Sequence, residues 1–436
     1  MKYFNIQTYG CSANQNNSEI LAGLLTQSKY QQTNSPQIAD IIIINTCIVK
    51  QKTEDKIKRK IQDLSKKYPK KILIITGCMP QTDEKQIKKL ATNSILLGTK
   101  HFKEITQLIK DNQQSQLDKK QNQYLTNEKE EKVLLPKISL NKLISITQIS
   151  EGCLGNCSYC KTKLAKGNLH SYPKEKIIKS IQSDIQNGAK EIWLTSQDCA
   201  SYGLDKNPQY QLPSLLKEIL NLKGNFKLRL GMSNPNHIYP ILQELIEIYK
   251  SKKIYKFLHI PIQSADDKVL KDMNRKYKIK QVEEIIKKFK KEFPDITIAT
   301  DIISGYPTET QQAHKNNLDF IKIYKPDVLN LSKFSSHKET SASRLKQLPI
   351  RIINKRTTEI MKLHRQTTQE NKQKFLDKII KVFINKKLLT SSLYESRDEN
   401  YNIILINSND KFILGKTLNV KIKQIGVHHM IGEIQP

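Results

Sequence analysis

Residues 143–160 read Leu-Ile-Ser-Ile-Thr-Gln-Ile-Ser-Glu-Gly-Cys-Leu-Gly-Asn-Cys-Ser-Tyr-Cys and contain three of the seven cysteines of this 436-residue chain. The apolar run at 143–149 predicts a buried strand. Gly152, Gly155 and Asn156 allow the backbone to turn tightly between the thiols. A closed structural zinc site uses four ligands, so three thiolates in one loop leave one coordination position open. Iron–sulfur clusters are also held by closely spaced thiolates, and this loop therefore predicts a metal centre.

Three reduced thiols in a protein core are the alternative, but the glycines and polar residues between these cysteines make a poor core segment. The spacing Cys-x3-Cys-x2-Cys, with Tyr159 before the last cysteine, resembles the signature of radical S-adenosylmethionine (SAM) enzymes. The continuation at 161–172 is similar to one branch of these enzymes. That branch comprises the tRNA methylthiotransferases that act on threonylcarbamoyladenosine, of the archaeal and eukaryotic type. The resemblance covers nearly the whole chain.

Three further cysteines, Cys11, Cys47 and Cys78, each follow a predicted strand within residues 1–112. Alternating strands and helices here predict an open parallel α/β sheet. The carboxyl ends of parallel strands share one edge of a sheet, so the three cysteines are expected to converge there. Three independent buried cysteines are the alternative. The strands are predicted at 3–8, 41–45, 72–76 and 95–97, and the helices at 18–27, 53–67 and 83–91.

The central region, residues 141–368, alternates six apolar runs with amphipathic segments and predicts a partial (β/α)6 barrel with active groups at its C-terminal face. The segments at its strand ends are similar to those that line the SAM pocket in the family, although an Asp or Ser there is otherwise a common helix cap. Cys199 is expected to be a bystander thiol. The predicted strands are 143–149, 191–195, 227–231, 256–262, 296–303 and 328–334. The predicted helices are 173–187, 212–222, 239–250, 280–293 and 310–324. The SAM residues implied by the resemblance are Tyr159, Gln197, Asp198, Ser233, Gln263, Asp301 and Gly305.

The regions on either side of the central one differ in composition. Residues 113–140 are mostly polar and without periodicity, which predicts a linker. Residues 369–436 hold short alternating runs separated by Asn, Asp and Gly, which predict a small β-barrel. This barrel resembles the TRAM domain, an RNA-binding module. Its strands are predicted at 379–383, 393–395, 403–406, 417–422 and 430–434.

The net charge of +31 indicates a polyanionic partner, although a bias toward lysine-rich composition also raises it. Residues 342–390 contain thirteen Lys or Arg and three Asp or Glu, and a charged helix is predicted at 351–376. A basic stretch of this kind suits a phosphate backbone, while a solvated helix face is the alternative. The RNA-binding candidates are Arg351, Lys355, Arg356, Arg365, Lys372 and Lys374. No apolar run has the length of a membrane span and no signal peptide is evident, so we expect a cytoplasmic protein without a membrane partner.

The resemblance implies a chemistry for these residues. Cys153, Cys157 and Cys160 would hold a [4Fe-4S] cluster that binds SAM, and Cys11, Cys47 and Cys78 a second one that supplies sulfur. The implied reaction is 2-methylthiolation of N6-threonylcarbamoyladenosine at position 37 of tRNA, next to the anticodon. The implied partners are tRNA and an electron donor protein. One segment departs from the family pattern, because His337-Lys338-Glu339 stands where an Arg-Pro-Gly-like turn is usual.

Two other functions remain open from the residues alone. The first is a methylthiotransferase of the same fold with another target, such as isopentenyladenosine in tRNA or a ribosomal protein. The basic stretch and the segment at 161–171 argue against a protein target. The second is a non-catalytic iron–sulfur protein that binds RNA.

Overall fold

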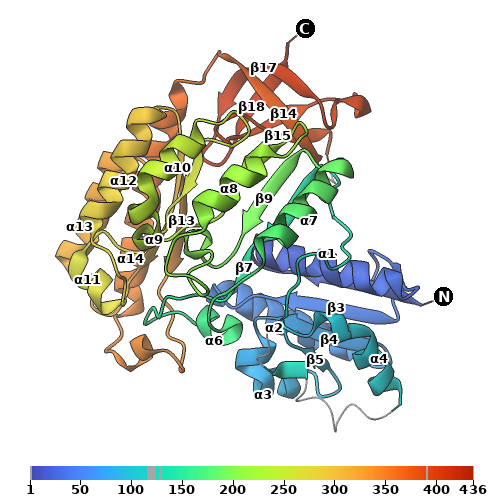
Figure 1. Ribbon diagram of the computed structural model, residues 1–436. Coiled ribbons are helices and arrows are strands. Elements are labelled where there is room, and N and C mark those ends of the chain that lie inside the picture. The colour runs from blue at the N-terminus through green and yellow to red at the C-terminus, as the bar shows by residue number, and fades with distance from the viewer. Residues whose placement is uncertain (1, 115–123, 127–129, 389–390, 436) are drawn as a thin grey trace.

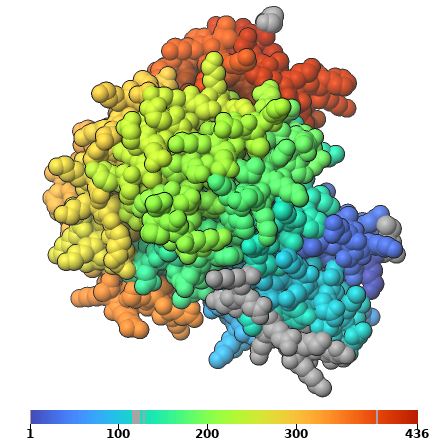
Figure 2. Space-filling model, viewed as in Figure 1, coloured from blue at the N-terminus to red at the C-terminus, as the bar shows by residue number. Residues whose placement is uncertain are grey.

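The computed structural model describes residues 2–114, 124–126, 130–388 and 391–435. An N-terminal α/β sheet and a C-terminal barrel lie on different sides of a larger central domain (Figure 1). The space-filling view shows the same arrangement, from blue through green and yellow to red (Figure 2). The predicted α/β fold class with a small C-terminal β-barrel is confirmed. Among the described residues, no helix combines the length and the apolar character that crossing a membrane requires.

The N-terminal sheet has five parallel strands in the order β2-β1-β3-β4-β5. Strand β3 is buried along its whole length, as expected for a parallel strand that is covered on both faces. Its run of four isoleucines supplies that apolar surface. The strands are β1 (Tyr3–Thr8), β2 (Gln31–Gln32), β3 (Ile41–Thr46), β4 (Ile72–Gly77) and β5 (Ile95–Leu97), and the helices are α1 (Ser12–Gln27), α2 (Gln51–Lys67), α3 (Pro80–Leu90) and α4 (Ile105–Gln113).

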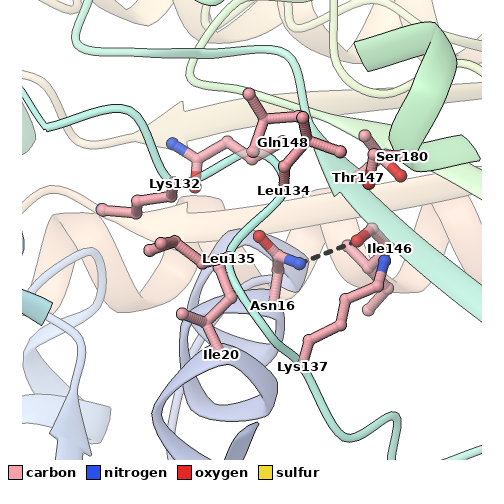
Figure 3. A pocket seen from close by; sticks show the side chains of 11 residues that line it. Asn16, Ile20, Lys132, Leu134, Leu135, Lys137, Ile146, Thr147, Gln148 and Ser180 are labelled. Carbon is pink, nitrogen blue, oxygen red and sulfur yellow. Dashed lines mark hydrogen bonds between the residues drawn. The ribbon is translucent and has the colours of Figure 1, made fainter. Parts of the chain in front are cut away.

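Helix α1 joins the N-terminal sheet to the central domain. The predicted start at residue 18 is wrong, because the helix begins at Ser12. Its first two turns carry Asn14, Asn16 and Asn17, which are polar but buried, and Asn14 Nδ2 donates within the N-terminal domain to the carbonyls of Tyr9 and Thr46. Asn16 Nδ2 donates a hydrogen bond to the carbonyl of Ile146 at 2.8 Å, beside a pocket of about 20 Å³ (Figure 3). Interdomain contacts therefore stabilise a helical turn whose composition indicates a loop.

Glu19 of α1 makes this junction sensitive to pH. Burial raises the pKa of its carboxyl from about 4.5 to about 7, although Lys137 opposes the rise, and Oε1 accepts a hydrogen bond from the Leu140 N–H. The folded state therefore favours the protonated form, and stability falls as the pH rises from about 4.5 through 7. At pH 8 we expect Glu19→Gln to be more stable than the parent by about 3 kcal/mol, at ~1.4 kcal/mol per pKa unit. At pH 4 the two should unfold at nearly the same urea concentration, and a difference that does not change with pH would contradict this assignment.

The central domain holds the six expected strands in two parallel sheets, with orders β10-β9-β6 and β11-β12-β13. A parallel bridge joins Leu228, in β10, to Ile254, which precedes β11. The two sheets thus form a partial (β/α)6 barrel with helices on its outer face (Figure 1). The strands are β6 (Ile144–Gln148), β9 (Glu191–Thr195), β10 (Lys227–Arg229), β11 (Phe257–His259), β12 (Thr297–Ser304) and β13 (Val328–Lys333), with a short pair β7 (Ser150–Glu151) and β8 (His170–Ser171). The helices are α6 (Thr162–Lys166), α7 (Lys174–Gln186), α8 (Leu212–Asn221), α9 (Pro235–Ile238), α10 (Leu242–Tyr249), α11 (Asp267–Asp272), α12 (Ile279–Glu292) and α13 (Gln311–Tyr324).

The predicted linker at 113–140 is partly built into the fold. Tyr124 packs in the N-terminal core, and its hydroxyl donates to Asp111 Oδ2 at 2.6 Å. Lys132 is buried, and the Ile138 N–H donates to the Glu19 carbonyl at 2.9 Å. The parts of this prediction at 115–123 and 127–129 lie outside the described residues.

The C-terminal barrel is closed, with the strand order β14-β15-β16-β18-β17, and it follows the long helix α14 (Ile350–Gln373). Tyr401 of the barrel inserts into an aromatic cluster at the amino-terminal side of the central strands. Its ring centroid lies 4.9 Å from that of Tyr255 and 5.0 Å from that of Phe257. Asn385 Nδ2 also donates to Glu191 Oε1 at 2.8 Å, so the barrel is firmly docked. The strands are β14 (Ile379–Lys387), β15 (Leu393–Arg397), β16 (Ile403–Asn407), β17 (Thr417–Ile425) and β18 (Met430–Ile434).

Candidate functional site

Six of the seven cysteines lie in loops that follow parallel strands. Cys47 and Cys78 directly follow β3 and β4, and Cys11 comes three residues after the end of β1; we call the three the N-terminal cysteine set. Cys153, Cys157 and Cys160 lie between β7 and α6, and we call them the loop cysteine set. Helix α6 packs against α3 of the N-terminal domain, which begins two residues after Cys78. The two sets therefore border the same junction between domains.

Hydrogen bonds tie together the strand ends that carry the N-terminal cysteine set. Thr46 Oγ1 donates to the Thr76 carbonyl at 2.6 Å and accepts from the Met79 N–H at 3.0 Å. Asn14 Nδ2 donates to the Thr46 carbonyl at 2.8 Å. These bonds hold the residues that flank Cys11, Cys47 and Cys78 in one network, as the strand order predicts.

Gly10 shows how closely two of these cysteines approach each other. Its φ of +103° is left-handed, and a Cβ atom added to it would lie 2.8 Å from the sulfur of Cys47. Only glycine combines this backbone conformation with the absence of a side chain. The turn before Cys11 is therefore built around the Cys47 side chain.

The thiols of the N-terminal cysteine set are poorly stabilised as anions by the protein alone. Burial raises the pKa of Cys78 to about 12, while the nearby charge of Lys166 opposes the rise and Cys47 and Cys11 add to it. Burial also raises the pKa of Cys47, and Cys11 adds to this effect. A bound metal deprotonates such thiols outright, so the set suits a cationic centre that the thiolates would surround.

The loop cysteine set is held by donors that point at sulfur. The Gly155 N–H donates to Cys153 Sγ at 3.2 Å, and Arg275 Nη1 donates to Cys157 Sγ at 3.2 Å. Burial raises the pKa of Cys153 to about 11. Hydrogen bonds to sulfur stabilise thiolate ligands and tune the centre that they hold. Arg275 has no signal in the sequence that links it to the cysteines, because it lies more than a hundred residues away from Cys157.

Hydrogen-bond donors aimed at sulfur are the feature of the loop cysteine set that suits iron–sulfur ligation, as at Cys153 and Cys157. In the described parts of the chain, no group of three His, Cys, Asp or Glu side chains is placed to hold a single metal ion.

Two residues expected at the SAM pocket lie beside the loop cysteine set or near it. Gln197 Oε1 accepts a hydrogen bond from the Gly152 N–H at 2.8 Å and is partly exposed. Ser233 is buried, and its hydroxyl donates to the Gly231 carbonyl at 3.3 Å. Gln197 is therefore placed to reach a ligand at the loop, whereas Ser233 is engaged within the protein.

Asp198 is also engaged within the protein. Its Oδ1 accepts from the N–H groups of Ala200 and Asn234, at 3.2 and 3.0 Å, and its Oδ2 contacts His237 Nδ1 at 2.6 Å. It caps the short 3₁₀ turn Cys199–Ser201, which is the capping role that a strand-end aspartate often has. The structure gives Asp198 a clear role in positioning the strand ends.

Two residues expected from the second sheet lie at neighbouring strand ends. Asp301 Oδ2 contacts His259 Nε2 at 2.8 Å, and Gln263 forms a parallel bridge with Ile302. Gln263 has a φ of 65°, so its backbone bends sharply at the strand end. These partly exposed side chains bring polar groups to the carboxyl end of the sheet, where barrel enzymes bind ligands.

The remaining two expected SAM residues have different surroundings. Gly305 is buried against Ile353 of α14, and its N–H donates to Glu309 Oε2 at 2.7 Å. Tyr159 packs at the edge of an apolar cluster that includes Met273. Gly305 thus shapes a turn, whereas Tyr159 borders the loop cysteine set.

The six RNA-binding candidates divide into exposed and buried residues. Arg351, Lys355, Arg365 and Lys374 are exposed. The expectation is wrong for Arg356, which is buried and bonds to Glu309, and for Lys372, which is buried and donates to the carbonyls of Gly426 and Val427. Both face inward because helix α14 packs on the central domain and on the barrel.

The loop that departs from the family pattern rests on the N-terminal domain. Ser335 Oγ donates to Gln51 Oε1 at 3.4 Å, at the start of α2. Burial lowers the pKa of His337, and the neighbouring charge of Lys161 lowers it further. Lys161 itself lies 2.6 Å from Asp83 Oδ2 and links the cysteine loop to α3. The departing segment thus covers the junction that both cysteine sets border.

Cys199 belongs to neither cysteine set. It is fully buried in the hydrophobic core of the central domain. The Ser196 hydroxyl donates to its sulfur at 3.4 Å. The expectation of a bystander thiol agrees with this position.

Comparisons with known proteins define the class first. Residues 147–321 match the Radical SAM superfamily, and residues 3–98 match the Uncharacterized protein family UPF0004. A solved structure of the radical SAM methyltransferase TsrM from Kitasatospora setae is similar in fold, with a TM-score of 0.59 and 11% identity over 79% of this chain and 75% of that one. The central domain therefore has the radical SAM fold.

Sequence relatives then define the family. The chain is 35% identical over 98% of its length to a probable threonylcarbamoyladenosine tRNA methylthiotransferase of Pyrococcus horikoshii, of which it also covers 98%. It is 35% identical over 98% of both chains to a protein of the same name from Archaeoglobus fulgidus. It is 32% identical over 98% of its length to the human threonylcarbamoyladenosine tRNA methylthiotransferase, of which it covers 73%. The chain belongs to the threonylcarbamoyladenosine tRNA methylthiotransferase family.

Proposed function

We propose that this chain is a radical SAM transferase that converts N6-threonylcarbamoyladenosine in tRNA into its 2-methylthio derivative. The observation that carries the proposal is the pair of cysteine sets, three thiols each, on either side of one domain junction. A single set would suffice to start a radical reaction. A second set beside it suits an enzyme that must also deliver sulfur to the same substrate.

Two [4Fe-4S] clusters and SAM are the proposed cofactors. When bound, they supply a radical that removes a hydrogen atom from the substrate, and a source of sulfur and methyl for the position so activated. The protein's own residues hold and shield this chemistry. Gln197 fixes the loop through the Gly152 N–H, and Arg275 places positive charge on the Cys157 sulfur. Tyr159, Met273 and neighbouring apolar side chains exclude water beside the loop.

The direct test uses protein that has been reconstituted with iron and sulfide under anaerobic conditions. We expect about eight irons per chain, the content of two four-iron clusters. With dithionite and SAM the protein should release 5′-deoxyadenosine, and tRNA from a deletion strain should lack the 2-methylthio nucleoside. Loss of only the 2-methylthio form of isopentenyladenosine would favour that nucleoside as the target, and an unchanged pool of all 2-methylthio nucleosides would favour a ribosomal protein. Iron without 5′-deoxyadenosine would favour a non-catalytic iron–sulfur protein.

The proposed partners are tRNA and an electron donor protein, and the proposed compartment is the cytoplasm. For tRNA we assign the exposed basic stripe of α14, defined by Arg351, Lys355, Lys362 and Arg365. These residues recur at helical spacing on one face. Lys362 is an addition to the candidates from the sequence, found by its exposure on the same face.

We expect the triple change Arg351→Glu, Lys355→Glu and Arg365→Glu to weaken tRNA binding about tenfold or more. The salt dependence of binding should also flatten, by about one unit of slope for each lost phosphate contact. Filter binding across a salt series measures both quantities.

A matched control changes the same number of charges elsewhere. Lys280, Lys291 and Lys322 are exposed lysines on α12 and α13, and their replacement by glutamate should have a much smaller effect. Equal losses for the two triple variants would mean that net charge alone governs binding.

A further inference from the structure

Three buried charges lie together at the domain junction. Lys132 Nζ is 2.8 Å from Glu151 Oε2, and Lys166 Nζ is 2.7 Å from Glu151 Oε1. The three side chains are 1–3% exposed. Burial would raise the pKa of the Glu151 carboxyl, but the two lysine charges outweigh it and hold the pKa at about 2. One carboxylate is thus in direct contact with two ammonium groups, while burial lowers the pKa of Lys132 to about 8 and the buried carboxyl of Glu130, which also bonds to the Phe102 and Lys103 N–H groups, opposes that fall.

Lys166 is the member of this triad that lies between the two cysteine sets. It ends α6, and the preceding Ala165 packs in the same apolar cluster as Cys47 and Cys78. The carbonyl of the following Gly167 accepts a hydrogen bond from the Cys153 N–H at 3.2 Å. The two neighbours of Lys166 therefore contact different cysteine sets: Ala165 packs with the N-terminal cysteine set, and Gly167 bonds to the loop cysteine set.

The charge of Lys166 acts on the N-terminal cysteine set. Helix α6, which Lys166 ends, packs against α3, and α3 begins two residues after Cys78. The interactions of Lys166 in turn include Cys78 and Cys11 as well as Glu151. Lys132 points elsewhere, with its ammonium 4.7 Å from the centre of the Phe102 ring.

A buried pair that only joins domains would need one lysine for one carboxylate. Removing charges from water costs several kcal/mol per ion, and a second buried lysine on one carboxylate is retained only where something offsets that cost. An anion at the N-terminal cysteine set would be such a partner. Three thiolates and an anionic sulfur ligand carry more negative charge than the iron–sulfur core that they surround would balance, and in a dry site that excess needs a positive partner.

We propose that Lys166, oriented by Glu151, is a positioning residue that stabilises the anionic sulfur species bound at the N-terminal cysteine set. This inference rests on the proposed function, which places a cluster with an open iron on that set. Because Glu151 is shared between Lys132 and Lys166, it does not fully neutralise Lys166, whose charge remains available to the sulfur anion. The role concerns the binding of sulfur and leaves the cleavage of SAM to the loop cysteine set.

The test uses the full chain with both clusters reconstituted and sodium sulfide as the probe. Hydrosulfide binding is followed by its effect on the electron paramagnetic resonance signal of the reduced cluster that does not respond to SAM. Lys166→Met leaves a compensated Lys132–Glu151 pair and should lower the affinity for hydrosulfide about tenfold or more, a factor that corresponds to ~1.4 kcal/mol. Lys166→Arg, which keeps the charge, should restore most of the affinity.

The double variant Lys132→Met/Glu151→Gln is the matched control. It removes the ion pairs but keeps both the charge of Lys166 and a hydrogen-bond acceptor beside it. We expect its affinity to stay within about threefold of the parent, since the field at the sulfur anion is retained. If the triad is purely structural, the double variant should lose more hydrosulfide affinity than Lys166→Met does. That order of affinities would overturn the proposal.

Two further measurements separate this proposal from the proposed function. Iron content and 5′-deoxyadenosine formation are measured in the same samples, and Lys166→Met should retain both. If Lys166→Met loses its second cluster, the test uses the two variants that keep the positive charge, Lys166→Arg and Lys132→Met/Glu151→Gln. Loss of hydrosulfide affinity in both of them would refute the role of Lys166. A parent protein that forms two clusters yet binds no hydrosulfide would refute the delivery of sulfur itself.

Discussion

Alanine in place of Cys157 is expected to reduce the formation of 5′-deoxyadenosine from SAM to the background of the assay. Each thiol of the loop cysteine set would bind a different iron, and Cys157 is also the sulfur that Arg275 contacts. Loss of this ligand removes the cluster on which reductive cleavage depends, and iron should fall from about eight to about four per chain. The measurement is anaerobic incubation with dithionite and SAM, followed by chromatography of the nucleosides.

Cys199→Ala is the control for this experiment, because Cys199 is a buried cysteine of the same domain that belongs to neither set. It should retain the iron content and the activity of the parent, with only the loss of stability that a small core cavity causes. Full activity of Cys157→Ala, or equal loss in both variants, would refute the assignment of the loop cysteine set.

Alanine in place of Cys78 is expected to abolish methylthiolation of tRNA but to leave the formation of 5′-deoxyadenosine. The loop cysteine set remains intact, so 5′-deoxyadenosine should still form. Methylthiolation of tRNA should fall to background, because the sulfur source depends on the N-terminal cysteine set. Iron should again fall to about four per chain. Incubation with tRNA lacking the modification, followed by nucleoside analysis, measures both products in one reaction.

The two cysteine variants together show which cysteine set is needed for the cleavage of SAM and which for the transfer of sulfur. If Cys78→Ala also loses 5′-deoxyadenosine while it retains iron in the loop cysteine set, the two sets are coupled more closely than the proposal requires. If it still methylthiolates tRNA, the N-terminal cysteine set has no part in sulfur transfer. Either result would leave the family membership unchanged, since that rests on the sequence relatives.

The sequence predicts the sheets and the convergence of the cysteines because both follow from periodicity. Cys11, Cys47 and Cys78 follow predicted strands that alternate with helices, a pattern typical of a parallel sheet, and parallel strands end at one edge. The start of α1 could not be predicted in this way. Its first turns are rich in asparagine, whose side chains are buried in the folded protein, where Asn16 bonds to the central domain.

Buried charges are the part of the site that sequence reasoning misses. Lysine, arginine and glutamate are almost always exposed, so Lys132, Glu151 and Lys166 give no sign of their shared burial. The same expectation misassigns Arg356 and Lys372 to the RNA surface. Arg275 is missed for a related reason, because its contact with Cys157 joins segments that only the folded barrel brings together.

The docked position of Tyr401 sets the distance between the C-terminal barrel and the cysteine sets. The C-terminal barrel is fixed at the amino-terminal side of the central strands, while both cysteine sets lie beyond their carboxyl ends. A five-residue strand such as β9 separates the two sides by roughly 17 Å, at ~3.3 Å per residue. A single RNA could therefore contact both the barrel and the thiols only if it extended along the whole central domain.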